Sequence, residues 1–172
     1  MNRPLAYLIT WTTRGTRLHG DERGSWKSIA GTGRSEFIRE DAAFLARQQE
    51  LARHDPLVLD HAARVVVDDA IRRVAEVRGW TMITSNIRTN HVHAVVGASA
   101  HTPEEILRQF KAWSTRALRE SGWIEGDRPV WTRHGSTRYL WDQESIASAG
   151  AYVRDGQDGH RWDQNPNPSR GA

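Results

Sequence analysis

The spacing of apolar residues changes along the chain from an alternating period to a helical one and back again. Residues 4–13 (PLAYLITWTT) are rich in β-branched and aromatic side chains and precede a turn-prone segment, which predicts a first strand. In residues 60–78, apolar side chains recur at the i, i+3, i+4 and i+7 positions of an amphipathic helix, which Gly79 would end. Residues 80–87 and 91–97 predict two strands of a hairpin, joined at residues 88–90.

The second half of the chain repeats this alternation. Thr102 and Pro103 are typical of a helix start, and the apolar spacing continues to Gly122. A strand over residues 130–141 and a helix over residues 143–155 follow. The predicted order is that of an α+β, ferredoxin-like (RRM-like) domain with a split βαβ antiparallel sheet and an extra C-terminal helix.

The segment between the first strand and the first long helix gives weaker patterns. About thirty residues after Thr13 are expected to form a long, basic, glycine-containing loop. A short helix is predicted over residues 39–54, ending at Asp55 because a residue before proline disfavours the helical conformation. The length fits a single domain, placed at residues 1–160, followed by a flexible tail at residues 161–172.

The amino-acid composition limits which metal ligands and which cellular locations are possible. The sequence has no cysteine, so any metal ligands would be nitrogen or oxygen atoms. No apolar run is long enough for a membrane span, and the first residues look like a strand rather than a signal peptide, so a cytoplasmic location is expected.

The basic residues are unusual in kind. Of 24 lysines and arginines, only Lys27 and Lys111 are lysine. Arginine suits bidentate contacts with phosphate, and the eight tryptophans could stack on bases, so the composition favours a nucleic-acid partner. A GC-rich genome would produce the same arginine bias, so composition alone leaves the question open.

His91 and His93 are the most specific candidates for a metal site. Side chains two apart in a strand point to the same side, so the segment His91-Val92-His93 places two imidazoles together. The apolar residues that follow suggest a buried central strand, where two polar rings without partners would be costly. A pair of solvated strand histidines is the alternative.

Tyrosine is the candidate nucleophile. Tyr7 and Tyr139 lie in predicted strands and are expected in the core. Tyr152 lies on the last predicted helix, three residues before Asp155, so its phenol and that carboxylate would share one helix face. Tyr152 could equally be a packed core residue, since Ile146, Ala149 and Val153 form an apolar stripe on the same helix.

Taken together, these segments resemble the IS200-like transposase superfamily, in particular its REP-associated tyrosine transposases. The resemblance covers about residues 5–157 and rests on five segments in order: LITWTTRGTRLHGDERGSW, NHVHAVV, QFKAWSTRALRE, PVWTRHGSTRYLW and AYVRDGQD. It implies a HUH endonuclease that cleaves and rejoins single-stranded DNA through a 5′-phosphotyrosine link.

By this resemblance, His91 and His93 would bind Mg²⁺ or Mn²⁺ and Tyr152 would attack the DNA phosphate. The family implies a homodimer, often with each tyrosine helix completing the partner subunit's site, that acts on hairpin-containing single-stranded DNA. We therefore expect a nucleoid-associated location in the cytoplasm, and the lack of a long apolar run predicts no membrane partner. Many relatives carry a Gln or Asn four residues after the tyrosine as third ligand, but Gly156 stands there. Gln157, or alternatively Asp155, is the expected replacement.

Several cations are expected to contact DNA phosphates. They are Arg14 and Arg17 in the predicted loop and Lys111, Arg116 and Arg119 on the helix after the histidines.

Two other functions fit the sequence less well. One is a single-stranded nucleic-acid-binding module without catalysis, which would need aromatic rings at the centre of the sheet. The other is a metal-dependent hydrolase that uses water in place of Tyr152.

Overall fold

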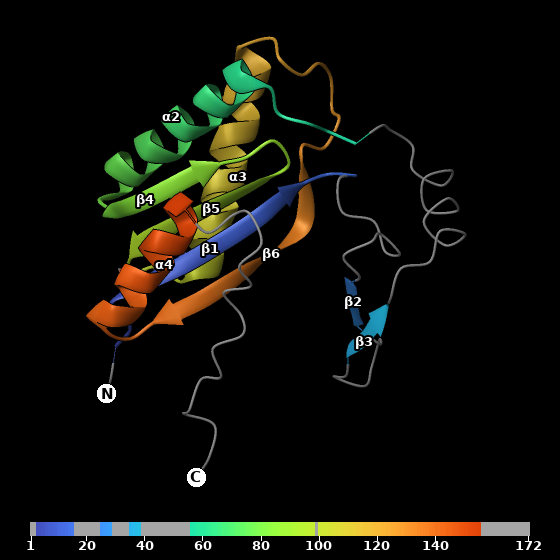
Figure 1. Cartoon of the computed structure of the whole chain (residues 1–172). Coiled ribbons are helices and arrows are strands. Elements are labelled where there is room, and N and C mark those ends of the chain that lie inside the picture. Colours follow the sequence, from blue (N-terminus) through green and yellow to red (C-terminus); the bar gives the residue numbers. More distant parts are fainter. Residues whose placement is uncertain (1–2, 16–24, 29–34, 39–55, 99, 156–172) are drawn as a thin grey trace.

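The computed structural model describes residues 3–15, 25–28, 35–38, 56–98 and 100–155. Figure 1 shows a sheet with helices on both of its faces. The elements, in chain order, are β1 (Ala6–Thr13), β2 (Ser25–Ser28), β3 (Ser35–Ile38), α2 (His61–Arg78), β4 (Met82–Ile87), β5 (His91–Gly97), α3 (Pro103–Glu120), β6 (Trp131–Leu140) and α4 (Gln143–Asp155).

The main sheet has four strands in the order β4-β5-β1-β6, and every neighbouring pair is antiparallel. The order of these strands and of α2 and α3 along the chain is that of the split βαβ arrangement. The predicted ferredoxin-like α+β fold with an added helix is therefore confirmed. β5, which carries the two histidines, is a central strand as expected.

Local sequence signals account for the ends of the two long helices. The Asp60 side chain accepts a hydrogen bond from the Ala63 backbone N–H at the start of α2. Gly79 ends α2 with a φ of 67°, a left-handed conformation that glycine adopts without strain. Thr102 caps α3 in the same way as Asp60 caps α2, with Pro103 in the first turn.

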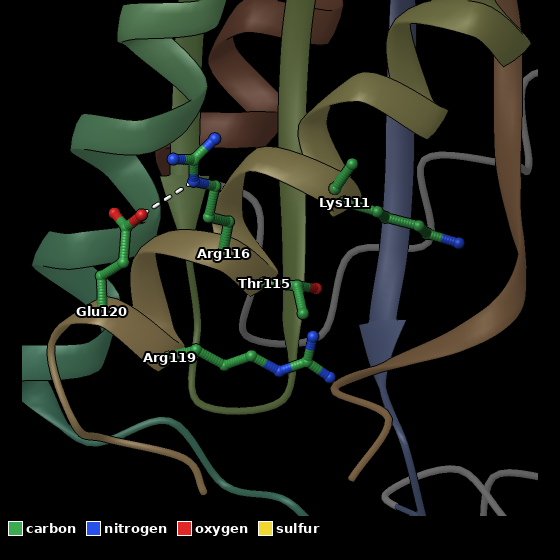
Figure 2. Close-up of a pocket in the computed structure, with 6 residues that line it drawn as sticks. Lys111, Thr115, Arg116, Arg119 and Glu120 are labelled. Atoms are coloured by element: carbon green, nitrogen blue, oxygen red, sulfur yellow. Dashed lines mark hydrogen bonds and ion pairs between the residues drawn. The ribbon is translucent and has the colours of Figure 1, made fainter. Parts of the chain in front are cut away.

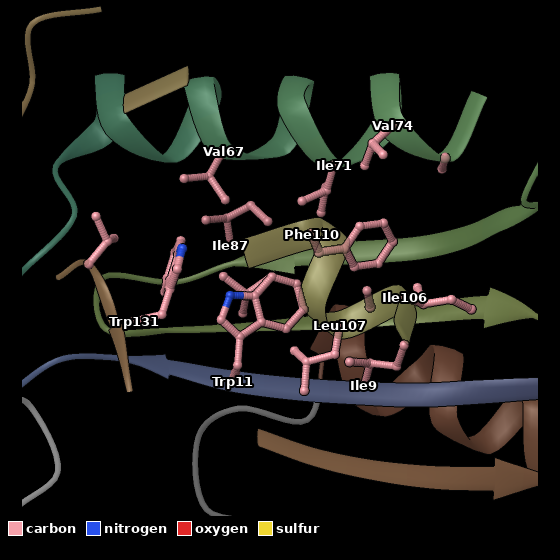
Figure 3. Packing of buried hydrophobic residues seen from close by; sticks show 14 of the residues in the cluster. Ile9, Trp11, Val67, Ile71, Val74, Ile87, Ile106, Leu107, Phe110 and Trp131 are labelled. Carbon is pink, nitrogen blue, oxygen red and sulfur yellow. The ribbon is translucent and has the colours of Figure 1, made fainter. Parts of the chain in front are cut away.

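The larger core lies between the sheet and helices α2 and α3 (Figure 3). On β1, alternate residues such as Ile9 and Trp11 point to this side, because successive strand side chains alternate between faces. Trp11 and Phe110 are fully buried, with ring centroids 5.9 Å apart. These contacts fix β1 beneath α3.

Helix α4 covers part of the opposite face of the sheet. Its buried residues Ala149 and Val153 pack against a small apolar group from β1, β5 and β6. That group comprises Ala6, Leu8, Val95 and Leu140. Farther along the same face, β1 and β5 present the polar side chains Thr10, Thr12, His91 and His93.

The structure corrects two sequence predictions. The segment expected to be one long loop contains β2 and β3, which pair with each other in an antiparallel hairpin; four-residue strands are too short for an alternating pattern to be recognised. Tyr139, expected in the core, is 42% exposed, because β6 is the edge strand of the sheet. The helix predicted at 39–54 and the tail at 161–172 lie outside the described residues.

The observed ends of β4 and β6 differ slightly from the predicted ones. β4 begins at Met82 rather than Trp80, whose backbone N–H bonds to the Ala75 carbonyl after the end of α2. β6 spans Trp131–Leu140, one residue shorter at each end than predicted.

Candidate functional site

The site is built on β5, where His91 and His93 project from the face that α4 partly covers. On β1, Thr12 pairs with His91 and Thr10 with His93. The two imidazole centroids are 4.8 Å apart, and His93 is only 6% exposed. The structure thus brings the two histidines together as the strand periodicity predicts.

Tyr152 comes to the same place from α4. Its ring centroid lies 5.4 Å from that of His93, with the two rings nearly perpendicular. Val153 is fully buried beneath the helix, while Tyr152 itself is partly exposed. His91, His93 and Tyr152 therefore form a continuous row of three rings within one chain.

A side chain on β4 holds the last turn of α4 against this row. The Asn86 amide donates a 2.7 Å hydrogen bond to the backbone carbonyl of Val153, the residue after the tyrosine. Asn86 is also the cross-strand neighbour of His93. One residue thus connects the histidine strand with the tyrosine helix.

The Nδ1 atoms of both histidines have protein partners. Asn90 Oδ1 lies 2.6 Å from His91 Nδ1, and because a carboxamide oxygen can only accept, that nitrogen carries the proton. Thr10 Oγ1 lies 2.7 Å from His93 Nδ1. When Nδ1 is engaged in this way, Nε2 is the nitrogen suited to a metal ion.

His93 is held in its neutral form. Burial, followed by the positive charges that His91 and Arg88 can carry, lowers the pKa of His93 to about 4. A neutral imidazole has a lone pair to donate to a cation, so His93 is ready to act as a ligand at neutral pH.

These donors fit a divalent metal ion in part. Two adjacent imidazoles supply two nitrogen ligands, a donor type that suits Fe²⁺, Ni²⁺ and Zn²⁺ and binds Mn²⁺ more weakly, so oxygen ligands would have to complete a site for Mg²⁺ or Mn²⁺. Among the described residues, no three His, Asp or Glu side chains are grouped so that they could hold a metal ion, so Asp155 does not complete the pair. Gln157, the other expected third ligand, lies outside the described residues.

The described cations that were expected to contact DNA lie on two different parts of the molecule. Arg14 is exposed just beyond β1, and Arg17 lies outside the described residues. Lys111, Arg116 and Arg119 line an open hollow of about 510 Å³ along α3, on the face of the sheet opposite α4. Figure 2 shows Arg116 turned toward Glu120, to which it is bonded at 2.7 Å, and Lys111 extended away from the helix.

The Lys111 side chain is hydrogen-bonded to the backbone of β6. Its ammonium group donates to the backbone carbonyls of Thr132, Arg133 and His134 at 2.9, 3.4 and 3.1 Å, and its burial lowers its pKa. A direct contact between Lys111 and DNA would have to replace these bonds.

Three residues at the site were not found from the sequence. Thr10 and Asn86 contact His93 or the tyrosine helix only because of strand pairing, which single-sequence periodicity does not reveal. Arg88, whose backbone N–H bonds to the His91 carbonyl, carries a positive charge close enough to affect His93. The sequence places Arg88 in a turn, and its closeness along the chain to His91 is the one signal that could have found it.

The fold and the site define a ferredoxin-like α+β domain in which a histidine pair and a helical tyrosine meet on one face of the sheet. No family model matches the sequence, and no curated protein sequence matches it. Among solved structures, the chain is similar to a REP-associated tyrosine transposase bound to a REP hairpin, with 10% identity and a TM-score of 0.48. The similarity covers 88% of this chain and 65% of that chain.

A second similar structure is a candidate transposase from Deinococcus radiodurans R1, with 12% identity and a TM-score of 0.46. Here the similarity covers 91% of this chain and 93% of the other. Within the described residues, no helix combines the length and apolar character needed to cross a membrane.

Proposed function

We propose that this protein cleaves and rejoins single-stranded DNA through a covalent tyrosine–phosphate link, as in transposition or a process derived from it. The observation that carries the proposal is the row of His91, His93 and Tyr152, with ring centroids 4.8 and 5.4 Å apart. A phenol beside a pair of imidazoles combines a nucleophile with a site for a divalent cation.

In the proposed step, Tyr152 Oη attacks a backbone phosphorus and forms a tyrosine–phosphate ester. The bond from phosphorus to the 3′ oxygen breaks. The phenol loses a proton and the departing 3′ oxygen gains one, so a free 3′-hydroxyl is produced. Attack by another 3′-hydroxyl on the ester reverses these changes and restores the tyrosine. No nucleotide cofactor is required, because one ester bond replaces another.

The chain's own residues prepare this attack. The edge-on contact with the His93 imidazole and the Asn86 bond to Val153 fix the position of the Tyr152 ring. Thr10 and Asn90 orient the two imidazoles through their Nδ1 atoms. His91 and His93 would hold Mg²⁺ or Mn²⁺, which when bound would polarise the scissile phosphate.

A homodimer and a hairpin-containing substrate belong to the same proposal. They are supported by the resemblance to tyrosine transposases in the sequence. Within one chain the three rings already lie side by side, and in a dimer the tyrosine helix of either subunit could complete the site.

The test is a covalent trapping experiment. The purified protein is incubated with labelled single-stranded DNA containing the hairpin repeats that flank its own gene, with Mg²⁺ or Mn²⁺, and separated under denaturing conditions. We expect a protein–DNA adduct that is lost in Tyr152→Phe and strongly reduced in His91→Ala. Tyr139→Phe is the matched control, because it removes a tyrosine hydroxyl at an exposed position on β6.

The other outcomes identify different functions. DNA cleavage without an adduct, unaffected by Tyr152→Phe, would indicate a metal-dependent hydrolase that uses water. Tight DNA binding with neither cleavage nor adduct would indicate a binding module. An adduct that survives Tyr152→Phe but not Tyr139→Phe would transfer the nucleophile to Tyr139.

A further inference from the structure

The ladder between β1 and β6 is interrupted close to the site. Trp11 pairs with Gly135 and Thr13 pairs with Trp131. Between these pairs, the single residue Thr12 on β1 faces Thr132, Arg133 and His134 on β6. We call these three residues of β6 the bulge. Such bulges redirect side chains and are frequent beside active sites.

Lys111 stabilises the bulge from the α3 side. The carbonyls of all three bulge residues accept hydrogen bonds from the Lys111 ammonium group, which has three protons to donate. Thr132 adds a hydroxyl bond to the His134 carbonyl at 3.1 Å. The bulge is therefore a fixed part of the fold, with its irregular backbone satisfied by a half-buried cation.

The bulge lies in line with the histidine pair across the sheet. His91 on β5 pairs with Thr12 on β1, and the Thr12 hydroxyl is 3.1 Å from that of Thr132 on β6. Neighbouring strands are about 4.8 Å apart, so the bulge is roughly 10 Å from His91. A single DNA strand covers such a distance in a few nucleotides.

The charge of this region suits a polyanion. The four strands of the main sheet contain no Asp or Glu, whereas β6 alone carries Arg133, His134 and Arg138. Arg133 and His134 are exposed, and their side chains make no hydrogen bond or ion pair with the part of the chain that the structure describes. Lys111 holds the backbone of the bulge, so both exposed side chains extend from a fixed segment at the edge of the sheet.

We propose that Arg133 and His134 bind phosphates of the single DNA strand on one side of the cleavage position, with Lys111 acting as a positioning residue through the bulge. The inference rests on the proposed function and adds the path of the substrate: from the His91–His93 pair, across Thr12, to the edge strand β6. It also gives Lys111 a different task from the direct phosphate contact that the sequence suggested.

The experiment measures DNA affinity on its own. In the Tyr152→Phe protein without added metal, Kd for fluorescein-labelled oligothymidylate is measured by anisotropy at several salt concentrations. We expect Arg133→Ala to weaken binding about fivefold, as for the loss of one exposed ion pair. The slope of log K against log salt should fall by about 0.7 for each phosphate that the protein no longer binds.

Arg73→Ala is the matched control, because Arg73 is an exposed arginine on the outer side of α2. If Arg133→Ala and Arg73→Ala have the same affinity and the same salt slope as the parent, the proposal is wrong. Equal losses of affinity by Arg133→Ala on oligothymidylate and on a blunt DNA duplex would also overturn it, because Arg133 would then not be specific to a single strand.

A double-mutant cycle tests the role of Lys111. If Lys111 acts through the bulge, Lys111→Met and Arg133→Ala should be non-additive in their effects on Kd, since removing the support already displaces Arg133. Additive effects would make Lys111 an independent contact and overturn its positioning role. Thermal unfolding of Lys111→Met separates this effect from a general loss of structure.

The results also distinguish this inference from the proposed function. An adduct in the trapping experiment, together with unchanged binding by Arg133→Ala, would overturn only the inference. Loss of affinity in Arg133→Ala without any adduct on cognate DNA would support the binding path and contradict the covalent chemistry. No DNA binding by the parent protein would overturn both.

Discussion

His93 is a buried polar side chain whose ring nitrogen is hydrogen-bonded. Its ring contacts His91 on one side and Tyr152 on the other, while Thr10 holds its Nδ1 atom. The protein therefore keeps it uncharged, and protonating it costs more in the folded state than in the unfolded chain.

This difference makes stability depend on pH in a defined range. In the folded protein the pKa of His93 is lowered from 6.5 to about 4, so the unfolded chain binds the proton more readily. The contribution to stability is fully present above pH 6.5 and is lost as the pH falls toward 4, by about 3 kcal/mol in total. Urea unfolding of the metal-free protein across this range should show the loss.

In His93→Gln, the part of the pH dependence due to this residue should disappear between pH 6.5 and 4. The same substitution at exposed His134 is the control. An unchanged pH profile in His93→Gln would show that another group is responsible.

Gly135 gives a second prediction at the scale of one residue. A Cβ atom there would lie 2.7 Å from the Thr10 carbonyl oxygen and 2.8 Å from Leu107 Cδ2. Gly135→Ala should therefore reduce the free energy of unfolding by about 2 kcal/mol, because the strand backbone would have to move.

Gly150→Ala is the contrasting variant for the same unfolding measurement. A Cβ atom there would meet only Arg154 Nη1, at an ordinary 3.6 Å. Gly150 lies within α4, so alanine should stabilise the protein by up to about 1 kcal/mol. Equal effects of the two substitutions would contradict this account of the glycines.

At the scale of elements, the attachment of α4 to the sheet decides whether the three rings meet. The helix buries small side chains, Ala149 and Val153, and its last turn is held by the Asn86 amide. Ile146 and Tyr152 pack against the same patch while partly exposed, so the apolar contact is modest and the Asn86 bond helps to set the position of the helix end.

Asn86→Ala should slow adduct formation much more than it lowers stability. Loss of one hydrogen bond costs about 1 kcal/mol, whereas a small displacement of a nucleophile can reduce the rate up to about a hundredfold. The adduct rate on cognate DNA and the urea midpoint are measured together. Ser85→Ala is the control, because it removes two hydrogen bonds, with Arg72 and Asp68, on the α2 side of the same strand.

If Asn86→Ala formed the adduct at the parent rate, the bond to Val153 would not position the tyrosine. A drop in rate matched by Ser85→Ala would instead point to a general weakening of β4.

The sequence predicts the helices and strands of this protein well, but it predicts the contacts between them poorly. The helical period of α2 and α3, the caps at Asp60 and Thr102, and the two-residue period around His91 are local features. The bond of Asn86 to Val153 and the engagement of Lys111 join residues 67 and 21 or more positions apart. Such contacts depend on pairing and packing, which local periodicity does not determine.

At the scale of the whole molecule, the apolar groups on the two faces of the sheet differ greatly in size. The larger core joins the sheet to α2 and α3, while α4 covers only a small apolar group on the other face. The order of elements was predictable from the succession of periods along the chain. The site was not predictable in this way, because the tyrosine lies about sixty positions after the histidines and no local pattern links them. Only the resemblance to a known family assigned all three residues to one site.

A chain ending at Asp142 should keep the sheet and its two long helices but expose the apolar patch beneath α4. Ala6, Leu8, Val95 and Leu140 would face water, so we expect stronger binding of an apolar dye and a lower unfolding temperature. Far-ultraviolet circular dichroism should retain the signal of the remaining helices. Complete loss of structure would show that α4 is needed for the fold itself.

The position of α4 after β6 also has a consequence for biosynthesis. During translation, the strands of the sheet and the paired histidines emerge from the ribosome before the segment that carries Tyr152. If the proposed function holds, a nascent chain would expose the DNA-binding sheet before the nucleophile, and cleavage would follow only after α4 has been made and has packed on the sheet.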